Sequence, residues 1–387
     1  MSSNFSVTAG TTPTSSPVNE VVISRRFRER GFLPKADPLV AFAPDSEFVP
    51  LDEIGRELPS LLKDRGFRQY VRTFKIPLWP ADRTRPEDLP GLRLYYVRTG
   101  FLASAYINQV GEPPATTLPA NLAEPLCRAC QLLRRPPILS YDGYALYNWK
   151  RFRKEGRITL GNIDTIQNFV HLYDEHWFIL VHVEIEAIAA RILDAIARVQ
   201  IALLQGGSID PALWDIAAAI GDQIGVLRRI PEHMDAALYY KTFRPYIRFF
   251  ENVSYEAIAP RSTRLSMNFR GETGAQSSIM PVLVAFMKIP HQPSMLTDHL
   301  ADMRNYMPFE HRMLIERIEA MPSIRGKAGK QPFNAILEAI AEFRSIHYGW
   351  AQEYINRWTS DPRGTGGTPY MEWLQQLIEE TRSFEID

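Results

Sequence analysis

Cysteine is almost absent from this chain, since Cys127 and Cys130 are the only two among 387 residues. A structural zinc site needs four ligands, and one C-x-x-C pair supplies only two of them. So few cysteines also exclude a disulfide framework and favour a cytoplasmic protein. We expect the pair to be two small residues on a helix over 126–133, and a redox dithiol is the alternative interpretation.

An excess of charge of either sign is missing as well, because 44 Lys and Arg residues balance 44 Asp and Glu residues. A chain that binds nucleic acid needs a basic face, and the sequence contains no basic run that would build one. We therefore expect no nucleic acid among the partners of this protein.

The chain also lacks a long uninterrupted apolar run. Residues 1–19 are rich in Ser, Thr and Pro and have no apolar core of the kind that a secretory signal requires. We interpret residues 1–22 as a disordered tail. Charged side chains interrupt the most apolar region, 176–204, which predicts a buried helix and no membrane partner. These side chains are Glu184, Glu186, Arg191, Asp194 and Arg198.

Proline is unevenly distributed, because 17 of the 29 prolines lie before residue 138. They break the first third into short elements, and long helical patterns follow. Strand signals are few. We predict an all-α fold with a small N-terminal domain over 23–168 and a large helical domain over 169–387 that can enclose a large flat ligand. The expected helices cover 176–204, begin at Asp210, cover 235–250 with a kink at Pro245, follow Thr273, and cover 332–358 and 370–382.

Two histidines fall on apolar helix faces. His347 lies four residues after Phe343 and three before Trp350, and His182 lies four after Phe178. An inward imidazole needs a partner, because an unpaired buried polar group costs about 1–3 kcal/mol. Ligation of a haem iron is one solution, and a hydrogen bond within the core is the other. Two such histidines on separate helices can flank one cofactor.

Other segments suit an amino-acid ligand. Tyr240 and Arg244 are four residues apart and share a helix face, and arginine is a natural bidentate partner of a carboxylate. A surface arginine is the alternative. The segment 271–278 (GETGAQSS) opens a helix, so its free N–H groups and Thr273 can hold polar groups of a substrate. The segment 364–367 (GTGG) lacks the Lys-Ser/Thr of a P-loop and is a candidate lid.

Six segments occur in a characteristic order: LPANLAEP (118–125), RPPILSYDGYALYNW (135–149), FRGETGAQSS (269–278), DMRNYMPFEHR (302–312), FRSIH (343–347) and GTGGT (364–368). Together they make the chain resemble the indoleamine 2,3-dioxygenase family over about residues 90–375. The resemblance implies a two-domain helical haem dioxygenase fold, with a large haem-binding domain and haem b as the cofactor.

The resemblance also implies roles for individual residues. His347 in FRSIH matches the proximal ligand of the haem iron, and Arg344 matches an arginine that meets a haem propionate. Arg244 in YYKTFR (239–244) matches the arginine that binds the substrate carboxylate. Thr273 matches the hydroxyl residue in the loop over the haem. Tyr141, Tyr144, Ala145, Phe178 and Tyr239 match residues that line the substrate pocket.

The chain departs from the usual family pattern at several positions. His182 aligns with the distal serine of the family, and related tryptophan 2,3-dioxygenases carry a histidine there and a tyrosine at the position of Tyr240. The distal site is therefore a hybrid in which His182 is the candidate catalytic residue. Tyr144 and Ala145 replace the common pocket residues. Val284 replaces an acidic residue, so the support of the proximal histidine is expected to differ.

The activity that the resemblance implies is an iron-dependent oxidoreductase of tryptophan catabolism, by the kynurenine pathway. It cleaves the indole C2–C3 bond of L-tryptophan or a related indoleamine with O2 and gives N-formylkynurenine. Arg244 holds the carboxylate, Thr273 the amine, and His182 meets the indole N–H or oxygen. A family monooxygenase that acts on a modified indole or another aromatic amino acid is an alternative. An oxygen-binding haem protein and a helical protein without haem are the non-enzyme alternatives. We expect an aromatic substrate and O2 as partners and favour a monomer.

Overall fold

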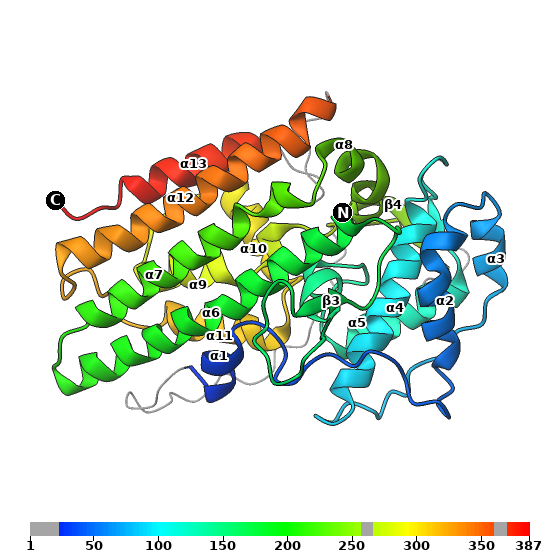
Figure 1. Ribbon diagram of the computed structural model, residues 1–387, viewed down its shortest axis with the longest axis horizontal. Coiled ribbons are helices and arrows are strands. Elements are labelled where there is room, and N and C mark those ends of the chain that lie inside the picture. The colour runs from blue at the N-terminus through cyan, green and yellow to red at the C-terminus, as the bar shows by residue number, and fades with distance from the viewer. Residues whose placement is uncertain (1–22, 257–265, 360–369) are drawn as a thin grey trace.

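A computed structural model describes residues 23–256, 266–359 and 370–387. The expected tail over 1–22 and the candidate lid over 364–367 lie outside these described residues. The predicted all-α class is confirmed, because long helices dominate the chain and the strands are short (Figure 1). The helices are α1 (Arg25–Arg30), α2 (Val49–Leu61), α3 (Phe67–Thr73), α4 (Leu89–Ile107), α5 (Ala120–Leu132), α6 (Tyr173–Gln205), α7 (Asp210–Leu227), α8 (Ala236–Leu238), α9 (Ile279–Met287), α10 (Met295–Arg304), α11 (Phe309–Glu319), α12 (Lys330–Tyr354) and α13 (Tyr370–Arg382).

The long helices α6, α7, α12 and α13 lie side by side at one end of the molecule, and α2 to α5 form the other end (Figure 1). α6 ends as predicted, because Gly206 adopts the left-handed conformation that closes a helix. α7 begins at Asp210, as predicted. Ile209 precedes the helix, and Asp210 and Pro211 occupy its first two positions. The Asp210 carboxylate accepts a hydrogen bond of 2.8 Å from the backbone N–H of Gly329.

The continuous helix predicted over 235–250 is wrong. The chain forms α8, then a π-helical turn η3 (Tyr239–Phe243), then a 3-10 turn η4 (Arg244–Ile247), and enters a strand at Phe250. Pro245 has no N–H to donate, so the regular helical ladder cannot continue through it. A second π-helical turn, η1 (Asp142–Leu146), follows α5. Isolated π turns are rare and occur frequently at functional sites. Short 3-10 turns also occur at η2 (Ile230–Glu232), η5 (Gly274–Gln276) and η6 (Asn356–Trp358).

The described residues also form two small sheets. In the first, β4 (Phe250–Tyr255) pairs in parallel with β1 (Thr117–Leu118) and antiparallel with β5 (Ser266–Phe269). In the second, β2 (Trp149–Arg151) pairs antiparallel with β3 (Ile163–Thr165). The first sheet therefore joins the segment before α5 to the segment between η4 and η5.

The apolar core falls into two clusters that share α6. One cluster gathers residues of α2, α4, α5 and η1, and the other gathers residues of α6, α7, α9, α11 and α12. Leu180 of α6 belongs to the first cluster and Val181 to the second. α6 is thus buried on opposite faces, which explains its nearly continuous apolar sequence. A domain boundary near residue 168 stays a prediction, because the shared helix lies directly after it.

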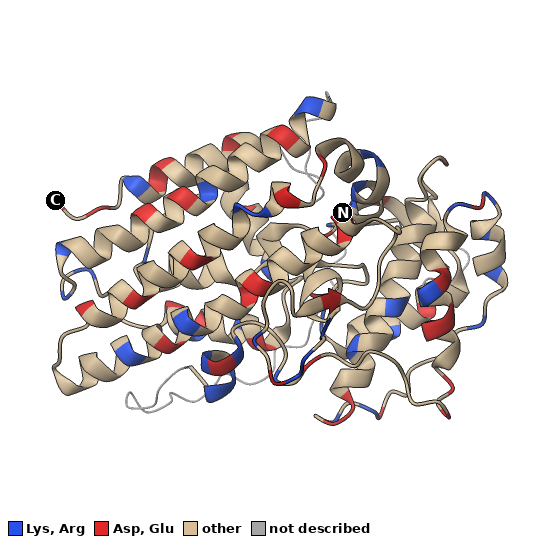
Figure 2. Ribbon diagram, viewed as in Figure 1, with Lys and Arg blue, Asp and Glu red and all other residues tan. Residues whose placement is uncertain are grey.

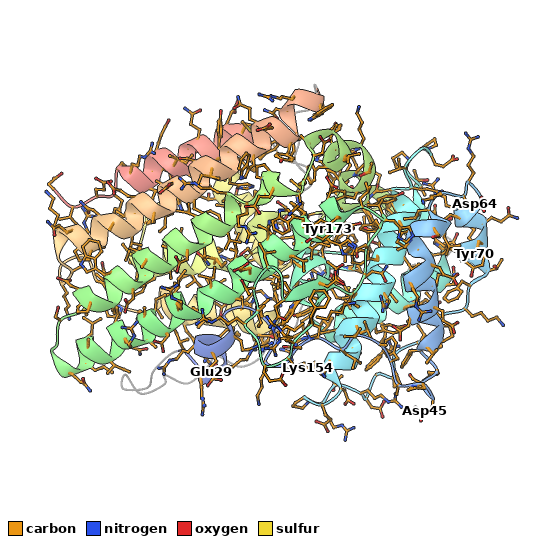
Figure 3. The ribbon with its side chains drawn as sticks, in the orientation of Figure 1. Glu29, Asp45, Asp64, Tyr70, Lys154 and Tyr173 are labelled. Carbon is orange, nitrogen blue, oxygen red and sulfur yellow. The ribbon has the colours of Figure 1, made fainter. Side chains whose placement is uncertain are left out.

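Charged side chains of both signs are interspersed along the ribbon (Figure 2), as the balanced composition indicates. Asp45, Asp64 and Tyr70 project outward at the α2 to α3 end (Figure 3). In the described parts of the chain, no helix combines the length and the apolar character that crossing a bilayer requires. Cys127 and Cys130 lie on α5 as free thiols, and burial raises the pKa of Cys127 to about 12, which disfavours the thiolate that redox chemistry needs.

Candidate functional site

His347 lies on α12, four residues after Phe343 and three before Trp350. Its side chain is accessible to solvent-sized molecules, yet burial by surrounding protein, with a smaller contribution from His182, lowers its pKa to about 4. None of the described residues forms a hydrogen bond with its ring. The imidazole is therefore neutral at physiological pH and keeps a nitrogen lone pair for a ligand.

His182 approaches the same region from α6. Its Nδ1 lies 2.7 Å from the backbone oxygen of Phe178, so Nδ1 carries the proton and donates it to that carbonyl. Nε2 consequently holds a lone pair, and no hydrogen-bond partner for it occurs in the described ranges. Burial lowers the pKa of His182, which keeps the ring neutral. The structure thus brings the two histidines on α6 and α12 near each other.

The surroundings of these histidines fit a large flat metal cofactor better than a bare metal ion. Within the described segments, no three His, Cys, Asp or Glu side chains are grouped so that they could hold a metal ion. A single imidazole suits a metal that brings its other ligands with it, as the iron of haem does. Partly buried apolar side chains flank His347 along α12, namely Phe343, Ile346 and Trp350.

An aromatic wall surrounds Phe178, one turn before His182 on α6. The ring centroid of Phe178 lies 4.6 Å from that of His182, 5.4 Å from Tyr239 and 6.3 Å from Tyr144. The ring of Tyr141 packs edge-on against His182, with centroids 5.9 Å apart. The wall therefore joins side chains of η1, α6 and η3, and it offers flat apolar surfaces beside an imidazole that can accept a hydrogen bond.

The two tyrosines of η1 donate to buried carboxyl groups. The Tyr141 hydroxyl donates to Oε1 of Glu186 at 2.8 Å, and the Tyr144 hydroxyl donates to Oε1 of Glu175 at 3.2 Å. Burial raises the pKa of Glu186 to about 7 and that of Glu175 to about 7. Ala145 is buried beside them. These bonds hold the η1 side of the wall rigidly against α6.

Arg244 is buried at the start of η4, with its guanidinium 5.1 Å from the ring centroid of Tyr240. The contact agrees with the face that the two residues were expected to share. Tyr239 turns the other way and contacts Phe178. Burial raises the pKa of Tyr239 to about 12, and the neighbouring Arg244 opposes this shift. Tyr240 stacks on Trp358 at 6.4 Å and so lies on the outer side of the turn.

Two predicted site residues remain, Thr273 and Arg344. Thr273 caps η5, where its hydroxyl accepts a hydrogen bond of 3.5 Å from the backbone N–H of Ala275. Arg344 lies three residues before His347, and its Nη1 donates to the backbone oxygen of Leu377 at 2.8 Å and to Thr381. Burial lowers the pKa of Arg344 to about 10.

Sequence reasoning missed three carboxyl groups at the site, Glu175, Glu186 and Glu272. Glu186 interrupts an apolar run four residues after His182, and this shared face was the available signal. Glu272 occurs in GETGAQSS, directly before Thr273. His311 is also buried, and its Nδ1 lies 3.0 Å from the Ser278 hydroxyl.

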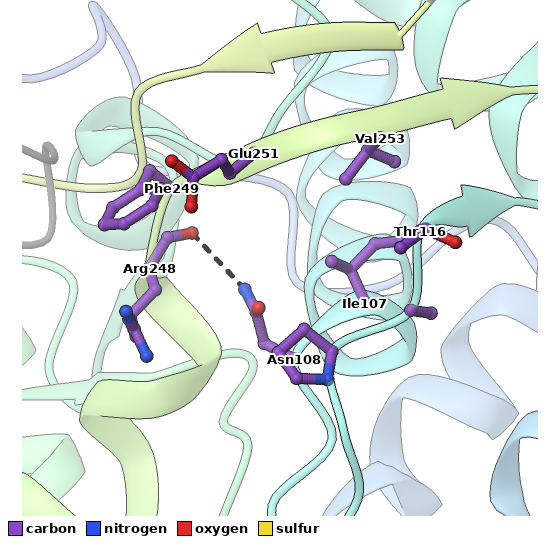
Figure 4. Close-up of a pocket in the computed structure, with 9 residues that line it drawn as sticks. Ile107, Asn108, Thr116, Arg248, Phe249, Glu251 and Val253 are labelled. Carbon is purple, nitrogen blue, oxygen red and sulfur yellow. Dashed lines mark hydrogen bonds between the residues drawn. The ribbon is translucent and has the colours of Figure 1, made fainter. Parts of the chain in front are cut away.

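A separate surface pocket of about 120 Å³ lies between the end of α4 and β4 (Figure 4). Asn108 crosses it and donates to the backbone oxygen of Arg248 at 3.3 Å. The pocket is smaller than the roughly 300–1,000 Å³ of typical small-molecule sites. No predicted site residue lines it. The two histidines and the aromatic wall around Phe178 are therefore the stronger candidate for the functional site.

Comparisons with known proteins identify the family of this chain. A family model described as "Indoleamine 2,3-dioxygenase" matches residues 25–363. Human "Indoleamine 2,3-dioxygenase 2" is 28% identical over 86% of this chain and 88% of its own length. A "6-hydroxytryptophan 2,3-dioxygenase" of Fusarium equiseti is 25% identical over 90% of this chain and 93% of its own. A "Myoglobin" of Haliotis madaka is 26% identical over 92% of this chain and 97% of its own.

Proposed function

This chain belongs to the indoleamine 2,3-dioxygenase family, and from that premise we propose that it cleaves the indole C2–C3 bond of L-tryptophan with O2 to give N-formylkynurenine. Membership makes it a haem-dependent oxidoreductase of the dioxygenase type. The substrate and the product are our proposal. The observation that supports it is the neutral, accessible imidazole of His347 near His182, whose ring packs against Phe178 of the aromatic wall.

His347 is the residue that would hold the iron of haem b. When bound, the haem supplies the iron at which O2 is activated for addition to the indole ring. Arg344, on the same helix, would meet a propionate with the N–H groups that it does not donate to α13. Burial keeps His347 unprotonated, so ligation does not compete with a proton above about pH 4.

The chain's own residues would position the substrate. The indole ring would stack against Phe178 between Tyr141 and Tyr144, and Nε2 of His182 would accept a hydrogen bond from the indole N–H. Arg244 would bind the carboxylate by charge-assisted hydrogen bonds. Because Tyr141 and Tyr144 are fastened to buried carboxyl groups, the wall is pre-organised before substrate arrives.

A ring-modified indole is the second candidate substrate. The Tyr144 hydroxyl and its partner Glu175 place polar atoms beside the aromatic wall, where a hydroxyl group on the indole ring could find a partner. The Fusarium relative, which is named for 6-hydroxytryptophan, motivates the same test. Insertion of a single oxygen atom into such a substrate is the monooxygenase form of this alternative.

The deciding experiment is aerobic turnover of the reduced holoenzyme with L-tryptophan under ¹⁸O2, with the product identified by mass. Incorporation of two labelled atoms into N-formylkynurenine is the expected result. One labelled atom would replace the proposal with a monooxygenase. Reversible oxygen binding without product, for L-tryptophan and 6-hydroxytryptophan alike, would support an oxygen carrier of the kind that the Haliotis relative's name describes.

A further inference from the structure

Three consecutive polar residues, Gln276, Ser277 and Ser278, lie between the loop 271–275 and the helix α9. The proposed function assigns no role to them. Gln276 is 1% exposed and Ser278 is 2% exposed. A buried polar side chain needs a hydrogen-bond partner, and each of these three finds its partner in a different part of the chain.

The carboxamide of Gln276 bridges two backbone groups. Its Oε1 accepts a hydrogen bond of 3.0 Å from the backbone N–H of Tyr141, and its Nε2 donates to the backbone oxygen of Gly271 at 2.9 Å. A carboxamide can do both because it carries one acceptor and one donor group. The bond to Gly271 closes the loop 271–276 on itself, and the bond to Tyr141 fixes that closed loop to the residue that directly precedes η1.

Ser277 acts on the other end of the same tyrosine. The Ser277 hydroxyl donates to Oε1 of Glu186 at 2.6 Å, and the Tyr141 hydroxyl donates to that same oxygen at 2.8 Å. Tyr141 is therefore held at its backbone by Gln276 and at its hydroxyl by the carboxyl group that Ser277 shares. A movement of the tyrosine away from α6 would break at least one of these bonds.

Ser278 anchors the three residues to the core. Its hydroxyl lies 3.0 Å from Nδ1 of His311, a buried residue of α11. Its backbone oxygen accepts a hydrogen bond of 3.1 Å from the N–H of Val282 in the first turn of α9. Gln276 and Ser277 thus extend from a base that two helices fix in place.

The position of Tyr141 bears directly on His182. The two rings pack edge-on with centroids 5.9 Å apart, and the Phe178 ring packs against the same imidazole at 4.6 Å. Nδ1 of His182 is bonded to the backbone oxygen of Phe178. With one nitrogen bonded and two aromatic neighbours, the imidazole has a fixed orientation, and that orientation sets the direction of its Nε2 lone pair. Displacement of Tyr141 removes one of the two neighbours.

We propose that Gln276 and Ser277 are positioning residues of the distal site, because they hold Tyr141 at both ends and thereby fix the imidazole of His182. Both act through Tyr141 and not on the substrate itself. This inference rests on the proposed function, since that function places His182 where it meets the indole N–H or oxygen. Ser278 is the anchor of the arrangement.

Amide hydrogen exchange of the holoenzyme tests the hold on Tyr141. Gln276→Met keeps the length of the side chain and removes both of its hydrogen bonds. The backbone N–H of Tyr141 should then exchange roughly tenfold faster or more, because a buried donor has lost its acceptor. Gln109→Met is the matched control. Gln109 is another buried glutamine whose amide donates to a backbone oxygen, that of Asp64, and its replacement should leave exchange at Tyr141 unchanged.

The C–O stretching band of the ferrous carbon monoxide complex tests the effect on His182. The frequency responds to polar groups beside the bound molecule, so it reports the orientation of a distal imidazole. His182→Ser should shift the band. Gln276→Met and Ser277→Ala should each shift it in the same direction, and together by less than the sum, because both act on one ring. Ser277→Thr keeps the hydroxyl and should restore the wild-type frequency, and Gln109→Met should not move the band.

Steady-state kinetics add a readout that general loss of stability would not give. In Gln276→Met and Ser277→Ala, kcat/KM for L-tryptophan should fall roughly fivefold or more, the effect of one weakened hydrogen bond. 1-Methyl-L-tryptophan has no indole N–H for His182 to accept and should respond less. Equal losses for the two substrates would contradict a role that acts through His182. Haem content and the unfolding midpoint of each variant are measured alongside.

The outcomes separate this inference from the proposed function. If His182→Ser shifts the band but neither Gln276→Met nor Ser277→Ala does, the positioning role is wrong and the proposed function stands. If both variants shift the band but the wild type gives no product from L-tryptophan, the function is wrong and the positioning role stands. If His182→Ser leaves the band unchanged, the distal assignment of His182 and this inference are both wrong. If Gln276→Met fails to fold, Ser277→Ala with its Ser277→Thr rescue decides the test, and an unchanged band in Ser277→Ala overturns the inference.

Discussion

The hydroxyl of Tyr141 donates a 2.8 Å hydrogen bond to Oε1 of Glu186, one helical turn after His182 on α6. The Ser277 hydroxyl donates to the same oxygen at 2.6 Å. One buried carboxyl group thereby joins η1, α6 and the segment before α9, three parts of the chain that are far apart in sequence. Its second oxygen, Oε2, is buried without a partner in the described structure, which suits the protonated form.

Stability should therefore depend on the protonation of Glu186. Burial raises its pKa in the folded protein to about 7, above the ordinary value of 4.5, so the folded state binds the proton more tightly. The stabilisation that this tighter proton binding gives the folded state is fully present below about pH 4.5, and it is lost as pH rises through 7. We expect Glu186→Gln to flatten the fall in unfolding free energy over this range by on the order of 2 kcal/mol. Urea unfolding of the holoenzyme at several pH values measures it.

Burial also raises the pKa of Glu175 and of Glu272, so all three carboxyl groups contribute to the pH dependence of the wild-type unfolding free energy. The difference between the wild type and Glu186→Gln isolates the contribution of Glu186. Tyr141→Phe is the companion variant, because it removes one donor and should cost about 1–3 kcal/mol. Tyr70→Phe, on the exposed face of α3, is its control. Parallel curves for the wild type and Glu186→Gln would contradict the prediction.

Removal of the His347 side chain should abolish stoichiometric haem binding. The ring is neutral, accessible and unpartnered within the described chain, so a bound iron is the partner that it gains. We expect His347→Gly to purify with little haem and to recover it when imidazole is added, as absorbance per chain would show. His233→Ala, at an exposed position after η2, should keep full haem content. A normal haem spectrum and full turnover in His347→Gly would rule out the assignment.

Arg244 should discriminate substrates by their carboxylate. Loss of a charge-assisted pair costs about 2–5 kcal/mol, so Arg244→Ala should raise the KM of L-tryptophan by roughly 30-fold or more and affect indole far less. Steady-state kinetics with both substrates measures the difference. Arg228→Ala is the control, because Arg228 forms an exposed ion pair with Glu342. Equal losses for L-tryptophan and indole would make Arg244 a structural residue.

His182 should set the acid limit of activity. Its Nε2 accepts a hydrogen bond only while the ring is neutral, and burial lowers its pKa below the ordinary 6.5. The acceptor is thus present at neutral pH and is lost as pH falls through the lowered pKa. We expect kcat/KM for L-tryptophan to decline in that acid range, and His182→Ser to flatten the decline while haem stays bound. The substrate 1-methyl-L-tryptophan lacks the indole N–H and should respond less. Unchanged pH profiles in His182→Ser would refute the distal role.

The helical periodicity of the sequence was enough to predict α6, α12 and α13, because an apolar stripe identifies the buried side of a long helix. It also placed His182 on a partly buried face, whereas the side chain of His347 is exposed. It failed over 235–250, where two non-standard turns and Pro245 interrupt the repeat. Turn type depends on local hydrogen bonds that a residue pattern does not encode.

The buried carboxyl groups show a second limit. A glutamate in a sequence indicates a solvent-exposed position, since charged side chains are seldom fully buried without a partner. Glu186 and Glu272 are buried because segments distant in the chain close over them, and only the tertiary structure contains that information. The resemblance to the family implied roles for residues that relatives share, and neither Glu186 nor Glu272 was among them.

The π-helical turns η1 and η3 bear on how such a site could diversify. Each closes its hydrogen bonds over one residue more than an α-helical turn does, so each is equivalent to a single added residue. Removing one residue from η1 would let the segment relax to an α-helix with its ends in place, while Tyr144 and Ala145 rotate by about 100° about the axis. One-codon deletions and insertions at η1 and η3 are thus a mutational route to new pocket linings that leaves the surrounding helices unaltered.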